Sequence, residues 1–286
     1  MRPTTTLLLL ACTLSTMLIM SCNVVDAPYE ETPDVPDTTA AVKQNVLLED
    51  FTGHYCGNCP AGTDILRQLE TAYGDRLIVI AVHAGNLALP NPPDFPSDFR
   101  TPDGNVLNGT FKNSLIGLPN GLINRVTVND GVVLNKDRWA EVVASELLKK
   151  PEVDLKVVRS YDSTTRTVTL DVDVKYLEAG TVDDNLAAVI TESKIISDQL
   201  DYRLANSHIE EYEFNHMYRA AVNGPWGEPL GTTAIAKGTT ISKRLTYTLP
   251  TGKPWVPANC DVVVYVHRHN TTKQVLQAQQ VSLTGQ

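Results

Sequence analysis

The sequence predicts an α/β domain followed by an all-β sandwich domain. In the first half, buried apolar runs alternate with a segment of helical spacing, and in the second half short strands follow one another between turn residues. The length of 286 residues exceeds what most single cores need. The predicted parts are a leader (1–21), a tether (22–43), the α/β domain (44–150) and the β-sandwich (151–286).

The N-terminus has the pattern of an export signal. Arg2 precedes an apolar stretch from Leu7 to Met20, which is short for a transmembrane helix and typical of a secretory signal. It ends in Leu-Ile-Met-Ser before Cys22, which resembles a bacterial lipobox. We therefore expect Cys22 to become the lipidated first residue of the mature protein and to anchor it on a membrane. The alternative is an ordinary signal peptide with an accidental cysteine.

The residues after Cys22 predict a flexible tether, and the overall charge excludes some partners. Asn23 to about Ala41 is rich in Pro, Asp, Glu and Thr and has too little apolar surface to fold. The formal charge is −9, and loss of the leader removes only Arg2, so the mature chain carries −10. This acidity argues against nucleic acid as a partner.

The first domain is predicted from a strand, a Cys-x-x-Cys pair, a helix and a second strand. Asn45–Phe51 and Leu77–His83 are apolar runs typical of buried strands, and Ala61–Tyr73 has helical spacing. Because proline is tolerated only near a helix start, Pro60 requires the helix to begin close to Cys56. A helix N-terminus lowers the pKa of a thiol, so this context predicts a redox motif.

In the redox interpretation Cys56 is the attacking thiolate and Cys59 resolves the mixed disulfide. The pair could instead be a permanent structural disulfide of an exported protein. A zinc site is disfavoured, because no second Cys-x-x-Cys or well-spaced histidine pair accompanies it, and the sequence indicates no cofactor. His54 could tune Cys56, although an exposed turn histidine is the commoner case.

These features together resemble a thioredoxin-like domain. Asp50 stands where thioredoxins carry a buried acid, so we expect burial to raise its pKa and the residue to assist proton transfer. Leu118-Pro119 stands where they have a cis-proline beside the disulfide, so we expect a cis bond at Pro119 and a substrate groove that includes Leu118. Tyr55 and Asn58, which depart from the usual residues of the motif, are expected to contact the client.

Between His83 and Gly117 lies a proline-rich insertion, which predicts a binding loop or lid.

The second domain alternates apolar and polar residues from Val168 to Tyr176 and contains further short strands, which favours an immunoglobulin-like sandwich. Its long excursion from Asp198 to Gly238 carries Trp226, a candidate partner-binding residue unless it packs on its own sheet. Cys260 is expected to be buried and inert.

Several segments together resemble one family, the outer-membrane-protein-twenty-eight-like lipoproteins of Gram-negative bacteria. They are the lipobox, the lead from Leu48 into the Cys-x-x-Cys pair, Phe99–Gly104 and Asn215–Gly227. The resemblance implies a lipid-anchored location in the cell envelope, at the outer membrane. It implies no settled biochemical function.

Two functions therefore compete. The leading hypothesis is a membrane-anchored thiol–disulfide oxidoreductase that acts on protein thiol or disulfide clients in the cell envelope. The alternative is a non-catalytic binding lipoprotein, receptor- or adhesin-like, whose Cys56–Cys59 disulfide is structural.

Overall fold

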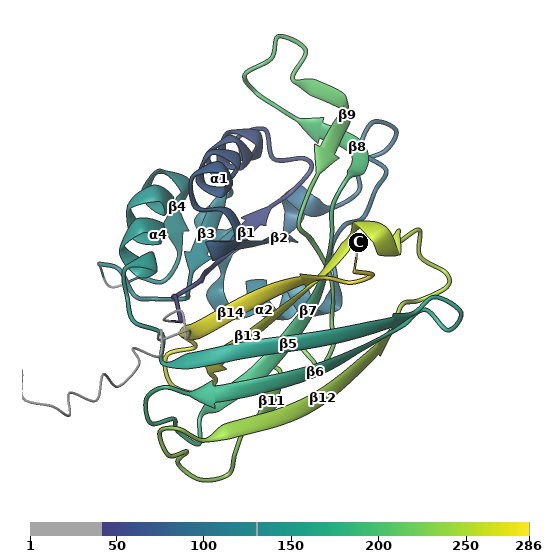
Figure 1. The fold of residues 1–286 in the computed structure, drawn as a ribbon. Coiled ribbons are helices and arrows are strands. Elements are labelled where there is room, and N and C mark those ends of the chain that lie inside the picture. The colour runs from purple at the N-terminus through teal and green to yellow at the C-terminus, as the bar shows by residue number, and fades with distance from the viewer. Residues whose placement is uncertain (1–41, 130, 286) are drawn as a thin grey trace, which may run out of the picture. The chain divides into compact units, whose positions relative to one another are not determined.

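A computed structural model describes residues 42–129 and 131–285, in which a mixed sheet of nine strands is the central element (Figure 1). Its strands run in the order β14-β13-β7-β10-β2-β1-β3-β4, and β11 pairs with β7. The strands are β1 (Val46–Thr52), β2 (Leu77–His83), β3 (Asn120–Ile123), β4 (Leu134–Asn135), β7 (Asp184–Glu192), β10 (Met217–Ala221), β11 (Glu228–Pro229), β13 (Cys260–Arg268) and β14 (Val275–Ser282).

The remaining elements cover this sheet or project from it. A sheet in the order β12-β6-β5 and a hairpin account for the other strands: β5 (Val153–Asp162), β6 (Thr167–Tyr176), β12 (Thr240–Thr248), β8 (Ile195–Leu200) and β9 (His208–Phe214). The α-helices are α1 (Cys59–Tyr73), α2 (Pro102–Phe111), α3 (Asn113–Ile116) and α4 (Trp139–Leu147). Among the described residues, no helix is long and apolar enough to span a membrane.

Alternation along β1 explains why the strand is buried over its whole length. Successive side chains of a strand point to opposite faces of its sheet. Val46 and Leu48 pack with the apolar faces of α1 and α4, whereas Leu47 and Phe51 join the cluster on the face that α2 covers. With helices on both faces, an uninterrupted apolar run is the stable sequence for this strand.

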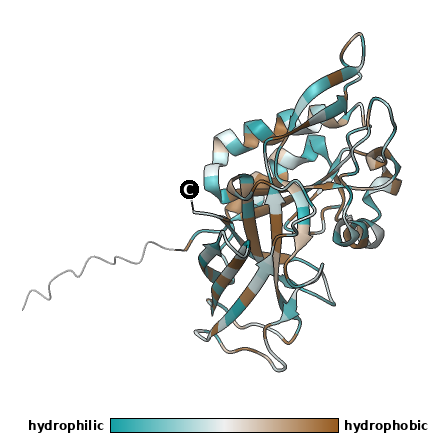
Figure 2. Ribbon diagram, turned by 90° about the vertical axis from the view of Figure 1, so that its right-hand side faces the viewer, coloured by the Kyte–Doolittle hydropathy of each residue, from teal (hydrophilic) through white to brown (hydrophobic). Residues whose placement is uncertain are grey.

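The C-terminal strands of the large sheet are covered differently. One face of β7 and β13 packs on the three-stranded sheet through apolar residues such as Leu186, Ile190 and Val264 against Leu170 and Val172. Figure 2 shows the hydrophobic segments concentrated in the strands at the centre of the protein. The two sheets thus form a layered β core in this part of the chain.

The predicted fold class, a thioredoxin-like α/β domain followed by a separate immunoglobulin-like sandwich, is wrong. The described chain is mostly β, and strands from both halves belong to one sheet. The junction is β10, which pairs in parallel with β2 at Met217–Ala81 and antiparallel with β7. Periodicity identifies strands but not their partners, so this junction could not be predicted from the sequence. The boundary expected at residue 150 stays a prediction about folding units.

Hydrogen bonds join the first described residues to β14 near the end of the chain. The Gln44 side chain donates to the Leu276 carbonyl (3.0 Å), and the Asn45 backbone N–H donates to the Gln277 side chain (2.9 Å). The Asn45 amide also donates to the Ala278 carbonyl (2.9 Å). These bonds tie the residues before β1 to β14, more than 230 positions later.

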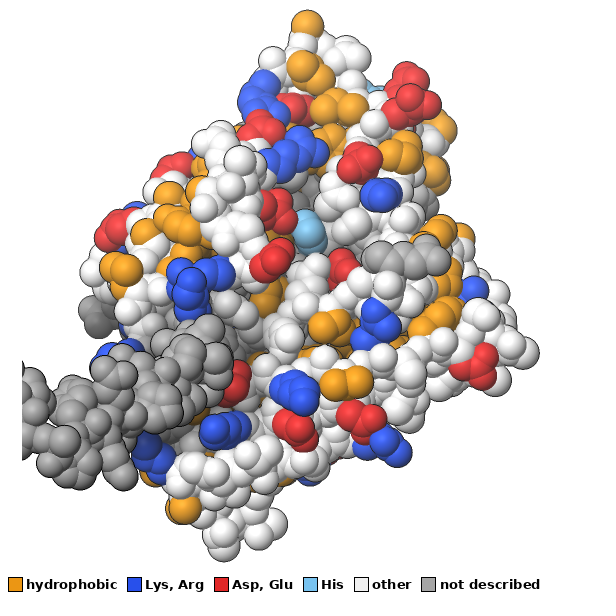
Figure 3. Space-filling view, in the orientation of Figure 1, with side chains coloured by type: hydrophobic (Ala, Val, Ile, Leu, Met, Phe, Trp, Pro, Cys, Tyr) orange, Lys and Arg blue, Asp and Glu red, His pale blue; other side chains and the backbone are white. Residues whose placement is uncertain are grey.

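The β8–β9 hairpin projects from the rest of the structure in Figure 1. Its two strands form a sheet of their own. Ile196, Tyr202 and Leu204 are exposed there by 56%, 62% and 42%. In Figure 3, hydrophobic side chains lie at the tip of this projection beside charged side chains of both signs.

Candidate functional site

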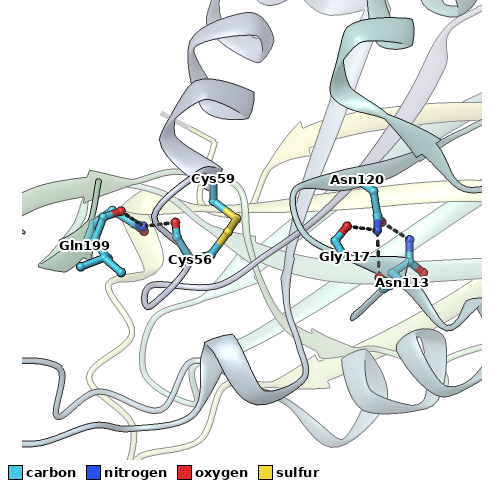
Figure 4. Close-up of a disulfide and its surroundings, with 7 residues drawn as sticks. Cys56, Cys59, Asn113, Gly117, Asn120 and Gln199 are labelled. Atoms are coloured by element: carbon cyan, nitrogen blue, oxygen red, sulfur yellow. Dashed lines mark hydrogen bonds between the residues drawn. A yellow bond between two sulfur atoms is a disulfide. The ribbon is translucent and has the colours of Figure 1, made fainter. Parts of the chain in front are cut away.

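The Cys56–Cys59 pair forms a disulfide at the start of α1 (Figure 4). β1 delivers the chain into a tight turn in which the Cys56 N–H donates to the Gly53 carbonyl and the Cys59 N–H to the Cys56 carbonyl, each at 3.0 Å. Pro60 occupies the first turn of the helix, as the sequence predicted. Each cysteine is only 2% exposed.

The β8–β9 hairpin covers the turn that holds the disulfide. The Gln199 side chain donates to the Cys56 carbonyl (3.1 Å), as Figure 4 shows. The backbone N–H of Leu200 donates to the His54 carbonyl (2.8 Å) and that of Tyr202 to the Gly57 carbonyl (2.9 Å). Three carbonyls of the turn region, those of His54, Cys56 and Gly57, thereby have partners on the hairpin.

Side chains of the hairpin also contact the disulfide turn and α1. The Tyr202 ring lies against Gly57 so closely that a Cβ at Gly57 would be 2.5 Å from the ring. Only glycine can stand at Gly57 while the hairpin keeps this position. Arg203 donates to Asp64 on α1 (2.6 Å) and to Asp201 (2.7 Å), which joins the hairpin to the helix. We call residues Gln199–Arg203 the strap.

Asp50 has the environment of a buried acid. It is 2% exposed, and desolvation raises its pKa to about 7, in the direction that the sequence predicted. Among the described residues, its Oδ1 has no hydrogen-bond partner. Asp50 lines a cavity of about 50 Å³ together with His83 and Gln199, and burial lowers the pKa of His83 to about 3.

Pro119 and its neighbours lie beside the first turn of α1. The Leu118–Pro119 bond is cis, which confirms the prediction. Asn58, Leu118 and Pro119 line one cavity of about 360 Å³, so the structure brings these three predicted residues together. Asn120, the next residue, is fixed by hydrogen bonds of its side chain with Asn113 and with the Gly117 carbonyl (Figure 4).

The residues before Cys56 differ in exposure. Tyr55 is 37% exposed, and its ring centroid is 5.1 Å from that of Phe95 in the proline-rich insertion. His54 is 1% exposed, so the expectation of an exposed turn histidine is wrong. Desolvation lowers the pKa of His54, which keeps the ring neutral at neutral pH.

Trp226 lies in a different environment from the disulfide turn. Its ring packs 5.5 Å from the guanidinium of Arg125, which is fully buried and paired with Glu49 at 2.7 Å. Lys273 Nζ is 4.8 Å from the Trp226 ring, and the Trp226 carbonyl is 3.0 Å from His267 Nε2. Trp226 therefore packs against the side chains of Arg125 and Lys273, and its role in partner binding stays a prediction.

The remaining cysteines of the chain are Cys12, Cys22 and Cys260, and Cys12 is outside the described residues. Cys22, the predicted lipidation site, is outside the described residues. Cys260 is 1% exposed, and burial raises the pKa of its thiol to about 12, which agrees with the expected inert thiol. No group of three or more His, Cys, Asp or Glu residues able to hold a metal ion occurs in the described chain.

Sequence reasoning did not identify the strap. Gln199 is 143 positions from Cys56, and no local pattern connects a strand of the second half to a turn of the first. The residue type at Gly57 was the one available signal, because a glycine between two cysteines permits close approach by another segment.

The sequence of the chain matches a known protein family. The family described as "Outer membrane protein Omp28" matches residues 110–286. The chain belongs to this family. The family supports the predicted location at the outer membrane of a Gram-negative bacterium, and that prediction is confirmed. No curated protein matches this Omp28-family chain in sequence.

Solved structures show where the fold recurs. HBP35 of Porphyromonas gingivalis is similar with a TM-score of 0.60 at 16% identity, over 85% of this chain and 76% of that chain. The likeness spans both halves of the Omp28-family chain and supports a shared fold. A domain of the outer membrane lipoprotein Omp28 from the same organism aligns over 48% of this chain and 91% of that chain, at 21% identity and a TM-score of 0.30.

Proposed function

We propose that this Omp28-family protein is a non-catalytic binding lipoprotein of the outer membrane and that its Cys56–Cys59 disulfide is structural. The observation that carries the proposal is the burial of both cysteines beneath the strap. Disulfide exchange requires a thiolate to reach one sulfur, and the rate depends on that access. A disulfide that is 2% exposed and covered by a hairpin is poorly suited to exchange with clients.

The same geometry suggests what the disulfide does. It closes the turn whose carbonyls accept hydrogen bonds from the strap, so it fixes the base on which the β8–β9 hairpin rests. The hairpin in turn presents Ile196, Tyr202 and Leu204 to solvent. Exposed apolar side chains on a projecting, fastened element favour contact with a partner.

The test is the reduction potential of the Cys56–Cys59 couple, measured on the purified protein in glutathione and dithiothreitol buffers. We expect a value below about −300 mV, which is typical of structural disulfides, whereas working oxidoreductases lie between roughly −270 and −120 mV. A value in the second range, together with mixed disulfides trapped by Cys59→Ser in cell envelopes, would overturn the proposal.

A double variant of the strap tests whether the strap protects the disulfide from reduction. Gln199→Ala with Tyr202→Ala should speed reduction of the disulfide by dithiothreitol at least 10-fold, because the covering contacts are removed. Ile196→Ala is the matched control, since its side chain is exposed on the same hairpin and should leave the rate unchanged. Equal rates in the wild type and the double variant would show that the strap does not protect the disulfide.

One observation favours thiol–disulfide exchange as a second candidate. A buried acid with a pKa of about 7, such as Asp50, is suited to accept and return a proton near neutral pH. In that case the Cys56 thiolate of the reduced pair attacks a client disulfide and releases one client thiol. Cys59 then displaces the second client thiol, so that the Cys56–Cys59 pair is oxidised and the client is reduced, while Asp50 moves the proton. With a client dithiol the same steps run in reverse. Exchange would require the strap to leave the turn, so the potential and the trapping experiment decide between the two candidates.

A further inference from the structure

One cavity carries basic side chains from four separate segments of an acidic protein. It has a volume of about 570 Å³ and lies between the proline-rich insertion, the start of β8, β10 and the segment before β13. Its basic residues are Arg100, Lys194, Arg219 and Lys253, and its acids are Asp98 and Glu192. The volume lies in the range of pockets that hold small molecules.

Both acids of the cavity are already neutralised. Arg219 Nε donates to Glu192 (2.7 Å), whose other oxygen accepts the Val256 N–H (2.8 Å). Arg100 donates to both oxygens of Asp98 (2.9 and 2.7 Å), and this bond lowers the pKa of the Asp98 carboxyl. The carboxylates therefore orient the two guanidinium groups and cancel their charge.

The two lysines give the cavity an excess of positive charge. Both are exposed, and within the described residues neither forms an ion pair with a carboxylate. The chain as a whole carries −9, so this local excess opposes the charge of the rest of the molecule. A cleft with one sign of charge concentrates ligands of the other sign.

Fixed donors face the same space. A guanidinium has five N–H donors, and Arg219 uses its Nε for Glu192, so its terminal amino groups remain for a ligand. The Trp255 ring, 5.9 Å from the guanidinium carbon, holds the Arg219 side chain in place. Thr101 and Pro102 also line the cavity, and there α2 begins with the positive end of its dipole.

We infer that this cavity binds a small ligand with phosphate or carboxylate groups. The inference rests on the proposed binding function and names the chemistry of a ligand for it. The orienting carboxylates, the two uncompensated lysines and the unused N–H groups of Arg219 favour a ligand of about two negative charges. Ile195 and Ile196 of β8 border the cavity, so an occupied site lies at the base of the projecting hairpin.

The test uses the full chain in non-ionic detergent. Binding of inorganic pyrophosphate and of citrate is measured by calorimetry at fixed ionic strength, with uncharged trehalose as the negative probe. The two anions distinguish phosphate from carboxylate recognition. In parallel, acylation of lysines by an amine-reactive reagent is quantified by mass spectrometry with and without each anion, which reports where the anion sits.

We expect saturable binding of at least one anion and at least threefold protection of Lys194 and Lys253, with Lys156 on β5 unprotected. Arg219→Gln should weaken binding at least 10-fold. Arg219 also pairs with Glu192, so its replacement could disturb the structure. The double variant Lys194→Gln with Lys253→Gln changes only exposed residues and should weaken anion binding to the same degree. Arg244→Gln is the matched control, since Arg244 pairs with Asp171 (2.6 and 2.9 Å) as Arg100 does with Asp98.

Absence of saturable binding by both anions would overturn the inference. So would equal weakening by the Arg244 control and the cavity variants, or protection of Lys156 to the same degree as the cavity lysines. These outcomes are separate from the reduction potential. If the reduction potential is low and no anion binds, the inferred anion site is refuted and the proposed structural role of the disulfide stands. If the potential lies in the range of working oxidoreductases, the proposed function is refuted, whatever the cavity binds.

Discussion

Replacement of Asp50 by Asn should stabilise the protein at alkaline pH. The side chain is buried, its Oδ1 has no hydrogen-bond partner among the described residues, and desolvation raises its pKa from 3.8 to about 7. In the unfolded chain the carboxyl ionises near its ordinary pKa, whereas in the folded protein it holds its proton until about pH 7. The unfolded state is therefore favoured progressively as the pH rises between these two values.

The size of the effect on the free energy of unfolding follows from the difference between the pKa values of Asp50 in the folded and unfolded states. At 1.36 kcal/mol per pKa unit, ionisation of Asp50 costs the folded state about 4 kcal/mol above pH 7. About 2–3 kcal/mol of this develops between pH 5 and pH 8, because at pH 5 most of the unfolded carboxyls are already ionised. Asn cannot ionise, so Asp50→Asn removes this pH dependence and leaves that of every other group.

The assay is urea unfolding of the wild type and Asp50→Asn at pH 5 and pH 8, with the disulfide intact. The quantity of interest is the difference in unfolding free energy between the two proteins and its change between the two pH values. We expect that change to be about 2–3 kcal/mol in favour of the variant. Asp75→Asn, at an exposed position, is the control and should give a change near zero. A change below about 0.5 kcal/mol for Asp50→Asn would refute the raised pKa and its assignment to desolvation.

Three further predictions concern other buried groups. Arg125→Met should destabilise the protein by about 3–5 kcal/mol in urea, because it leaves the Glu49 carboxylate buried without its partner, and adding Glu49→Leu should recover most of the loss. Burial lowers the pKa values of His83 and His267 to about 3. The free energy of unfolding should therefore fall as the pH drops below 6.5, because histidines of the unfolded chain take up protons there. Replacing either histidine by Gln should reduce this loss of stability in an acid titration. Cys260 should resist alkylation by iodoacetamide in the native protein at pH 8 and react fully in urea, because its buried thiol has a pKa of about 12; rapid native labelling would contradict the burial.

Local features of the first half could be predicted from the sequence. The strand before Cys56, the helix that starts at the second cysteine and the strand after it follow from apolar spacing and from the position of Pro60, and the structure contains all three as β1, α1 and β2. The acid at Asp50 could be identified from the resemblance to thioredoxins, which carry a buried acid at this place before the first cysteine, and burial raises its pKa as expected. The two strands and the helix depend on interactions within a few residues.

The fold class could not be predicted, because it depends on which strands meet. Met217 beside Ala81 decides that β10 continues the sheet of the first half, and the two residues are 136 positions apart. The burial of the disulfide was missed for the same reason, since the strap comes from β8 and its following turn. The basic cavity likewise combines Arg100, Lys194, Arg219 and Lys253, which share no local pattern.

The bonds from Gln44 and Asn45 to β14 have a consequence for the order in which the protein can be completed. The start of the described chain finds its partners only after the last strand has been made, and the edge of β2 is closed only when β10 docks on it. A chain that folds from its N-terminus therefore carries an open sheet edge and uncovered apolar strands until β10 and β14 have been made. Such edges attract other strands, which makes this interval the one in which the chain is most prone to aggregate and most dependent on chaperones.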